Sequence, residues 1–356
     1  MTSQSFDQFV GTKPVEERHR FDTARLEDFM RAHVEGYSGA LEVAQFKGGQ
    51  SNPTYRLSAG GRHYVLRKKP PGKLLPSAHA VDREYRVIKA LHGVGFPVPR
   101  PYALCEDDGV IGTMFYIMDC VEGRVLWDQS LPGMTKAQRF AIWDELNRVI
   151  ARLHTIDYKA VGLESFGKPG NYLERQIGRW TKQYQASETR KIEAMDNLIA
   201  WLPKNIPAGD ETTVVHGDFR LDNTIFHPTE PRIIAVLDWE LSTLGHPLAD
   251  FAYHCMSWHI EQGGPFRGLG HIDHAAFGIP TEAEYVAMYC KRMGHAPIDT
   301  RAWNFYLAYN LFRAAGITQG IMKRVQEGTA ASLFAVEAGK KARPMAERGW
   351  EFAERM

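Results

Sequence analysis

The hydrophobic pattern of the chain changes between its first third and the remainder. Short alternating runs of apolar residues occupy 41–46, 54–59 and 63–68, and glycine-rich segments separate them. This alternation predicts an antiparallel sheet, because it places apolar side chains on one face while glycine suits the intervening turns. From residue 135 onward, apolar residues recur at helical spacing over long stretches. We therefore expect a small sheet-containing lobe and a larger helical lobe.

The two lobes are expected to span residues 1–120 and 121–356, which makes the fold class α+β. A chain of 356 residues is longer than one compact core usually spans, and this length also favours two lobes. No flexible linker lies between them, so the segment 119–124 is expected to be a hinge strand. Helices are predicted at 24–34, 80–93, 135–158, 172–187, 190–202, 281–293 and 300–326.

The composition favours small-molecule chemistry. The formal net charge is +1 and no lysine or arginine block stands out, so the sequence lacks the electrostatic signature of a nucleic-acid-binding protein. The longest apolar runs, such as 233–237, are far shorter than the roughly 20 residues that span a bilayer. The N-terminal residues are polar and the cysteines form no close pair. We therefore expect a cytoplasmic protein without a nucleic-acid or membrane partner.

The stretch 214–240, which reads VVHGDFRLDNTIFHPTEPRIIAVLDWE, predicts a β-hairpin with polar side chains at its open end. Two apolar runs flank a turn between Pro228 and Pro231, and both prolines can lie outside the strand ladder. A turn centred there places Asn223 and Asp238 on neighbouring rungs at the end opposite the turn. Two oxygen-bearing side chains that converge in this way form a site for a hard cation such as Mg²⁺.

Asp218 precedes this hairpin, on the loop that leads into it. A carboxylate there can accept the proton of a hydroxyl group as the hydroxyl oxygen attacks phosphorus. Phosphoryl transfer needs little covalent chemistry from the protein, so positioned charge supplies most of the catalysis. The spacing from Asp218 to Asn223 matches the D-x-x-x-x-N of the protein-kinase catalytic loop, and Asp238 stands in place of the metal-binding Asp that follows it.

The motifs HGDFRLDN (216–223), VLDWELSTLGHPLADFA (236–252) and YVLRKKPPG (64–72) resemble the aminoglycoside phosphotransferase family of small-molecule kinases. The first two motifs are specific, and the glycine-rich loop is much less so. The resemblance extends from about residue 20 to 335. It is greatest to a branch related to the kinase domains fused to acyl-CoA dehydrogenases. It implies a protein-kinase-like fold, with ATP between a small N-lobe of antiparallel sheet plus helix and a larger, mostly helical C-lobe.

The resemblance implies roles for five residues of the motifs at 216–223 and 236–252. Asp218 would be the catalytic base, and Asn223 and Asp238 would be ligands of Mg²⁺. Arg220 stands where protein kinases often carry a lysine that contacts the transferring phosphate, so we expect this catalytic role for it. Asp250 is expected to brace the catalytic loop.

Nucleotide binding is implied for the N-lobe. The phosphate-covering turn in FKGGQSNPTYRL would use Gly48, Gly49, Gln50, Ser51 and Asn52. Arg67 matches the position that pairs with the phosphates and is favoured, but Lys68 is adjacent and points to the other face of the strand, so the choice stays open. Glu84 is the expected acidic partner on the N-lobe helix. The adenine would be read by the backbone of Met118, Asp119 and Cys120.

Two departures from protein kinases bear on the substrate. Gly217 replaces the arginine that senses a phosphorylated activation loop, and no A-P-E segment follows Asp238. We therefore expect neither control by activation-loop phosphorylation nor a protein substrate. His216 is implied to support the loop backbone rather than to act as a base.

The sequence thus predicts a Mg²⁺- and ATP-dependent kinase that phosphorylates a hydroxyl of a small molecule. The resemblance implies a hydroxyacyl-CoA or a hydroxy acid as acceptor, and a functional link to an acyl-CoA dehydrogenase. An aminoglycoside-type antibiotic kinase is one alternative, and a nucleotide-binding pseudokinase or scaffold without turnover is another. A metal-dependent hydrolase that uses the histidines of 254–259 and 271–274 is a third, and it predicts bound zinc.

Overall fold

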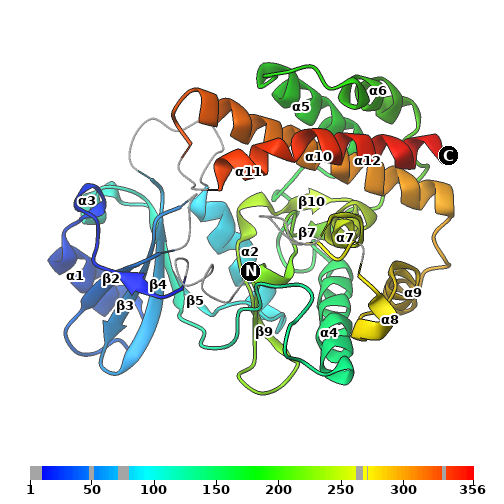
Figure 1. Ribbon diagram of the computed structural model, residues 1–356. Coiled ribbons are helices and arrows are strands. Elements are labelled where there is room, and N and C mark those ends of the chain that lie inside the picture. Colours follow the sequence, from blue (N-terminus) through cyan, green and yellow to red (C-terminus); the bar gives the residue numbers. More distant parts are fainter. Residues whose placement is uncertain (1–9, 48–51, 71–79, 262–267, 271, 331–333) are drawn as a thin grey trace. The chain divides into compact units, whose positions relative to one another are not determined.

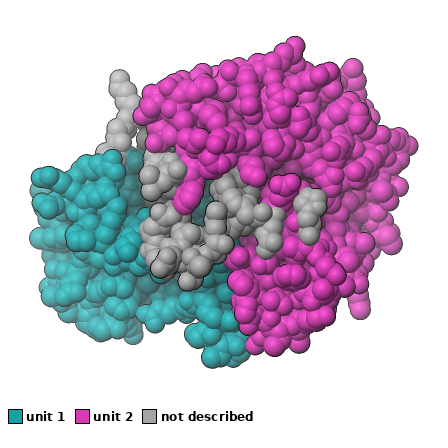
Figure 2. Space-filling model, in the orientation of Figure 1, with its two compact units in different colours: residues 1–127, 161–163, 224–242 teal, residues 128–160, 164–223, 243–356 magenta. Residues whose placement is uncertain are grey.

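The chain forms two compact units (Figures 1 and 2). The computed structural model describes residues 10–47, 52–70, 80–261, 268–270, 272–330 and 334–356. Unit 1 comprises Met1–Trp127, Val161–Leu163 and Thr224–Ser242, and unit 2 comprises Asp128–Ala160, Glu164–Asn223 and Thr243–Met356. The chain therefore passes from one unit to the other several times.

A six-stranded antiparallel sheet forms the centre of unit 1, with strand order β1-β2-β3-β4-β6-β5. Its strands are Thr12–Lys13 (β1), Glu42–Phe46 (β2), Thr54–Ala59 (β3), Arg62–Lys68 (β4), Pro101–Cys105 (β5) and Phe115–Asp119 (β6). The helices of this unit are Thr23–His33 (α1), Val81–Gly93 (α2) and Asp108–Ile111 (α3). Gly60 and Gly61 join β3 to β4 with φ of +56° and +74°, which glycine adopts without a steric cost.

Helices α1 and α2 lie on opposite faces of this sheet. Leu26 of α1 shares a buried cluster with Leu66 of β4. Arg67, the next residue of β4, contacts Glu84 of α2. Successive side chains of a strand point to opposite faces, so the two helices must be on different sides of the sheet.

The predicted hairpin is present and belongs to unit 1. Its strands β8 (Thr224–Phe226) and β9 (Ile233–Val236) are antiparallel, and the first residue of β8 pairs with the last residue of β9. Asn223 therefore directly precedes one strand at the open end, and Asp238 follows the other strand by two residues. The predicted register of the hairpin is confirmed, but both residues lie just beyond the ladder and not on its rungs.

Unit 1 extends beyond the predicted boundary at residue 120. The N–H of Arg124 donates to the carbonyl of Phe226 at 2.8 Å, and the N–H of Phe226 donates back at 2.9 Å. The N–H of Val236 donates to the carbonyl of Pro97 at 2.8 Å. These bonds attach the hairpin to the first part of the chain, so no single cut separates the units. β6 ends at Asp119, the first residue of the expected hinge strand, and the rest of that segment makes one isolated bridge at Arg124.

Helices make up most of unit 2. They are Lys136–His154 (α4), Tyr172–Ala186 (α5), Glu193–Trp201 (α6), Pro247–Cys255 (α7), His274–Phe277 (α8), Glu282–Met293 (α9), Thr300–Gln326 (α10), Ala335–Lys340 (α11) and Ala342–Glu354 (α12). Thr135 caps α4 as predicted, because its side chain accepts a hydrogen bond from the N–H of Gln138 at 3.3 Å. The long helix α10 contacts α5, α6, α7, α11 and α12, so it is the central element of this unit.

Two short strands of unit 2 connect the sequence motifs to the helices. They are Thr213–Val215 (β7) and Thr243–Gly245 (β10), and they pair antiparallel. β7 leads into the loop that carries Asp218, β10 leads into α7, and β7 also contacts α7. The loop and α7 are thereby brought together.

The architecture is α+β, as predicted, with an antiparallel sheet in one unit and mostly helices in the other. Helices α7, α11 and α12 and the pair β7–β10 were not anticipated from the sequence. None of the helices in the described ranges is both long and apolar enough to cross a bilayer.

Candidate active site

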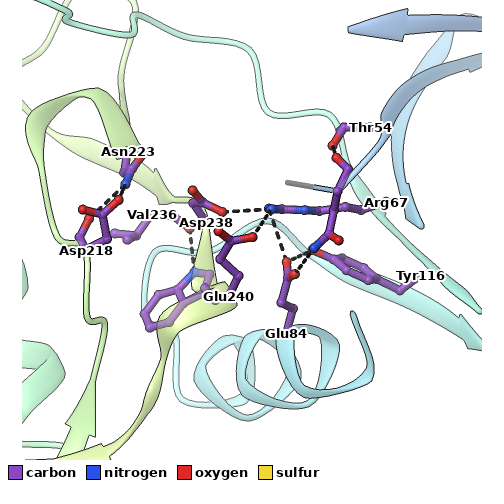
Figure 3. Close-up of polar contacts among 11 residues, drawn as sticks. Thr54, Arg67, Glu84, Tyr116, Asp218, Asn223, Val236, Asp238 and Glu240 are labelled. Atoms are coloured by element: carbon purple, nitrogen blue, oxygen red, sulfur yellow. Dashed lines mark hydrogen bonds and ion pairs between the residues drawn. The ribbon is translucent and has the colours of Figure 1, made fainter. Parts of the chain in front are cut away.

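Arg67 of β4 is the centre of a charged cluster in unit 1 (Figure 3). Its Nη1 lies 3.2 Å from Oε2 of Glu84, and its Nη2 lies 2.9 Å from Oδ1 of Asp238 and 3.4 Å from Oε2 of Glu240. The side chain of Arg67 is 11% exposed and that of Glu84 is 1% exposed. Burial opposes the charge on Arg67, but neighbouring groups, Glu84 first, outweigh it and raise its pKa. One guanidinium therefore joins carboxylates from α2 and from the segment after β9.

Glu84 has two further hydrogen-bond donors. Nδ2 of Asn52 donates to its Oε1 at 2.8 Å, and the hydroxyl of Tyr116 donates to its Oε2 at 3.1 Å. Burial raises the pKa of Glu84 to about 7, against the opposing effect of Arg67. The predicted pairing of Arg67 with Glu84 is thus present. Asn52 was expected to cover the phosphates, and in this structure its side-chain amide donates a hydrogen bond to Glu84.

Lys68 lies on the opposite face of β4 from Arg67. Its ammonium is 5.1 Å from the centre of the Phe21 ring and 5.7 Å from that of Tyr55. The residue is 5% exposed, and burial lowers its pKa. Of the two basic residues that the sequence leaves open, Arg67 is the one that contacts the acid on α2. Its pairing with phosphate stays a prediction.

The end of β6 holds the three residues expected to read the adenine. Met118 lies inside the strand and is 8% exposed. The N–H of Asp119 donates to the carbonyl of Arg100 at 2.9 Å, and the N–H of Cys120 donates to the carbonyl of His63 at 3.3 Å. Two of the expected N–H groups are therefore used by the sheet. The other expected nucleotide residues, Gly48, Gly49, Gln50 and Ser51, lie outside the described residues.

Asp238 follows β9 in a left-handed backbone conformation, with φ of +65°. Such a conformation is uncommon for a residue with a side chain. It directs the chain into a 3-10 helix, Trp239–Leu241, whose Trp239 is buried and lies edge-on to Phe96. The Asp238 side chain remains 36% exposed. The turn thus buries the tryptophan and leaves the neighbouring carboxylate accessible.

Asp250 of α7 anchors the loop that carries Asp218 in unit 2. Its Oδ2 accepts the N–H of His216 at 2.8 Å, and its Oδ1 accepts the N–H of Gly217 at 2.8 Å. Nε2 of His154 lies 3.2 Å from Oδ2. Burial alone would raise the pKa of Asp250, but His154, and then His216 with its backbone N–H, hold it below its usual value. The brace that the resemblance implies is present.

Three of the described side chains contact the Asp218 carboxylate, which is 17% exposed. The hydroxyl of Tyr253 donates to Oδ1 at 2.6 Å, and Nε of Arg220 lies 3.2 Å from the same oxygen. Nδ2 of Asn223 donates to Oδ2 at 3.0 Å and to the Asp218 carbonyl at 2.9 Å (Figure 3). Asn223 uses its amide nitrogen in both bonds, so its amide oxygen is the atom that can bind a cation.

Two neighbours complete the loop. Nδ1 of His216 accepts the N–H of Asp218 at 3.2 Å, so this imidazole supports the backbone as the resemblance implies. Nη2 of Arg220 lies 3.2 Å from Oδ2 of Asp222, and the Arg220 side chain is 33% exposed. A partly exposed guanidinium beside the Asp218 carboxylate can approach a further anion. Contact with a transferring phosphate stays a prediction.

Sequence reasoning missed two residues of this site, Tyr253 and Arg313. Nη2 of Arg313, on α10, donates to the carbonyl of Gly217 at 2.7 Å, and its guanidinium lies 4.8 Å from the centre of the Tyr253 ring. Tyr253 could have been found from its position three residues after Asp250, because such residues share a helix face. No signal in the sequence marks Arg313.

The chain is similar in sequence to a known family and to part of a longer relative. A sequence profile described as the phosphotransferase enzyme family matches residues 42–285. Mouse acyl-CoA dehydrogenase family member 10 is 49% identical over 344 residues, which are 96% of this chain and 32% of that protein. The chain thus spans about a third of that relative's length.

Solved structures share the fold. A protein from Ralstonia eutropha, named as a candidate aminoglycoside phosphotransferase, is 62% identical with a TM-score of 0.87 over 94% of this chain and 99% of its own. A choline kinase from Cryptosporidium parvum is 15% identical, with a TM-score of 0.64 over 94% of this chain and 97% of its own. An aminoglycoside phosphotransferase in ternary complex with AMP-PNP and hygromycin B is 17% identical, with a TM-score of 0.59 over 92% of this chain and 98% of its own. The two distant structures show the fold alone, and the predicted kinase-like fold class is confirmed.

Proposed function

Because the chain belongs to the phosphotransferase enzyme family, we propose that it is an ATP-dependent kinase for a hydroxyl group of a small molecule. Asp218 is the proposed catalytic base. The observation that carries the proposal is the Asp218 carboxylate, which Tyr253 and Asn223 hold on a loop that α7 anchors. A base fixed in this way is what phosphoryl transfer requires of a protein.

In the proposed reaction, the oxygen of the acceptor hydroxyl forms a bond to the γ-phosphorus of ATP. The bond from that phosphorus to the bridging oxygen breaks, and ADP leaves with the electron pair. The hydroxyl proton passes to Asp218. General-base catalysis of this kind contributes about 10²- to 10⁴-fold to a rate.

The amide oxygen of Asn223 and the carboxylate of Asp238 fit Mg²⁺. Both are hard oxygen ligands, and they flank the open end of the β8–β9 hairpin along the chain. Bound there, the ion would supply charge neutralisation for the phosphates. Arg67 holds the Asp238 carboxylate, with Nη2 2.9 Å from Oδ1, and so orients it.

The nucleotide site that we propose uses Arg67 for the α- and β-phosphates. Its contact with Glu84 supports this choice over Lys68. Arg220, which is partly exposed beside Asp218, is proposed to contact the transferring phosphate. The turn at 48–52 and the end of β6 would complete the site. The fold shared with a protein crystallised with AMP-PNP supports ATP as the donor.

We propose a hydroxyacyl-CoA or a hydroxy acid as the acceptor. The support is the 49% identity to part of a protein named for the acyl-CoA dehydrogenase family. The same relationship supports a functional link between this kinase and an acyl-CoA dehydrogenase. A second candidate is an aminoglycoside, because the Ralstonia eutropha protein, at 62% identity, carries that name.

Release of ADP from Mg·ATP, measured with a panel of acceptors, tests the proposal. The panel contains hydroxy acids, their CoA thioesters, aminoglycosides and choline, and Asp218→Asn is the control for enzyme-dependent turnover. We expect stimulation by the hydroxy acids or their thioesters. Nucleotide binding without stimulation by any compound would favour a pseudokinase. Stoichiometric zinc with turnover in the absence of ATP would favour the hydrolase.

A further inference from the structure

The Asp218 carboxylate has one hydrogen-bond donor that the sequence motifs do not explain, the hydroxyl of Tyr253. This hydroxyl donates to Oδ1 at 2.6 Å, while Nδ2 of Asn223 donates to Oδ2 at 3.0 Å. We propose that Tyr253 is a positioning residue for the base, which fixes Oδ1 so that Oδ2 receives the proton of the acceptor hydroxyl. The proposal rests on the proposed kinase function, in which Asp218 is the base.

The acceptor capacity of the carboxylate indicates which oxygen is available. Each oxygen of an ionised carboxylate can accept about two hydrogen bonds. Oδ1 accepts one hydrogen bond, from the Tyr253 hydroxyl, and also forms an ion pair with Arg220, whose Nε lies 3.2 Å away. Among the described side chains, Asn223 is the one donor to Oδ2. Two of the described side chains thus lie at Oδ1 and one lies at Oδ2, so Oδ2 is the less crowded oxygen for a substrate hydroxyl.

The Tyr253 hydroxyl acts as a donor in this bond. Burial of the hydroxyl, and then the charge of Asp218, raise its pKa, so the phenol keeps its proton. A separation of 2.6 Å lies in the range of charge-assisted O–H···O⁻ bonds, which are stronger than neutral ones. The bond therefore restrains rotation of the Asp218 carboxylate.

Tyr253 is itself held by the same elements that hold the loop. The guanidinium of Arg313 lies 4.8 Å from the centre of the Tyr253 ring, and its Nη2 donates to the carbonyl of Gly217 at 2.7 Å. Asp250, three residues before Tyr253 on α7, accepts the N–H of Gly217. These two α7 residues share one helix face. Helices α7 and α10 thus fix the tyrosine and the residue before Asp218 together, as positioning requires.

Tyr253→Phe tests the proposal, because it keeps the ring and its contact with Arg313 and removes the hydroxyl alone. We expect kcat to fall about 10- to 100-fold while KM for Mg·ATP stays unchanged, since the lost bond serves the base and not the nucleotide. Tyr306→Phe is the matched control. It also removes a buried hydroxyl, which lies 3.2 Å from Nε2 of His246, and should leave kcat unchanged.

A spectroscopic readout separates positioning from a general structural role. Infrared spectra of protein labelled with ¹³C-aspartate, at one fixed neutral pH, contain an Asp218 carboxylate stretch that is assigned by its loss in Asp218→Asn. We expect this band to shift in Tyr253→Phe and to stay in place in Tyr306→Phe. Thermal unfolding of each variant would show that both are folded.

The outcomes distinguish this proposal from the proposed function. An unshifted band in folded Tyr253→Phe would overturn the positioning role, and so would an unchanged kcat. Loss of kcat with an unshifted band would assign Tyr253 a structural role and equally count against the proposal. If the wild-type protein phosphorylates no acceptor, the proposed function fails, and with it the positioning role in catalysis; the band would then report a structural bond only.

Discussion

Nη1 of Arg67 lies 3.2 Å from Oε2 of Glu84, and in unit 1 the side chain of Glu84 is buried while that of Arg67 is largely shielded from solvent. Moving two charges out of water is costly, and their attraction offsets this cost only while both partners remain. Hydrogen bonds from Asn52 and Tyr116 complete the surroundings of Glu84. The pair is therefore a fixed part of unit 1, unlike a surface salt bridge.

Arg67→Met should lower the free energy of unfolding by about 3–5 kcal/mol. The substitution leaves the buried Glu84 beside Asp238 and Glu240 without the cation that joins them. Urea unfolding measures the effect. The double variant Arg67→Met with Glu84→Gln should recover part of the loss, because the buried carboxylate is then neutral. Strict additivity of the two single effects would show that the residues are not coupled.

Asp218→Asn should reduce kcat by about 10²- to 10⁴-fold, because an amide cannot accept the hydroxyl proton. The dissociation constant for ATP should stay nearly the same, since the substitution preserves size and leaves the Arg67 cluster intact. Steady-state kinetics and calorimetric titration with ATP provide the two measurements. If the variant binds ATP much more weakly but keeps a normal kcat at saturating ATP, another carboxylate is the base.

Asp238→Asn should weaken Mg²⁺ binding by about 10- to 100-fold, as expected for the loss of one charged ligand. The concentration of Mg²⁺ that half-activates turnover should rise accordingly. A second measurement needs no turnover: Mg²⁺ with ADP should raise the unfolding temperature of the wild-type protein more than that of the variant. Glu106→Gln, at an exposed carboxylate of the same unit, should behave as wild type.

The stability of unit 2 should fall as the pH drops from about 6.5 to about 4. Burial lowers the pKa of His254 and of His246 to about 4. In an unfolded chain a histidine has a pKa of about 6.5, so between these values the unfolded state binds protons that the folded state does not. Above pH 6.5, each histidine therefore adds up to about 3 kcal/mol to the free energy of unfolding. This contribution is lost as the pH falls toward 4.

Urea unfolding of His254→Gln across this pH range checks the sign. Glutamine does not titrate, so the slope of unfolding free energy against pH should be smaller than in the wild type. Nε2 of His254 lies 2.9 Å from the Tyr285 hydroxyl, and the glutamine amide can replace this bond in part. The control His92→Gln, at an exposed position of α2, should leave the slope as it is. An identical slope in all three proteins would contradict the assignment.

Local rules account for much of the secondary structure. The two glycines between β3 and β4 and the cap at Thr135 follow from the conformations and hydrogen bonds that these residue types favour. Helix α7 (Pro247–Cys255) escaped prediction because most of its residues are buried, which removes the alternation of apolar and polar faces. The assignment of the β8–β9 hairpin to unit 1 depends on long-range bonds to Arg124 and Pro97, which a local pattern does not encode.

Some residues of the candidate site could likewise be predicted from the sequence, and others could not. The spacing of Asp218, Asn223 and Asp238 was enough to select these three residues, whereas Arg67 was favoured over Lys68 because of the resemblance to a known family. Tyr253 and Arg313 reach the loop from helices that tertiary packing brings to it. A buried arginine that bonds a carbonyl has no sequence signature, so such residues can be found only from coordinates.

The return of Thr224–Ser242 to unit 1 has a consequence for the evolution of the protein. A gene segment ending at Trp127 would encode Arg67 and Glu84 and omit Asp238 and Glu240, which contact the same guanidinium. A single recombination breakpoint therefore cannot transfer this unit intact to another protein. We therefore expect the gene segments that encode the two units to be inherited together.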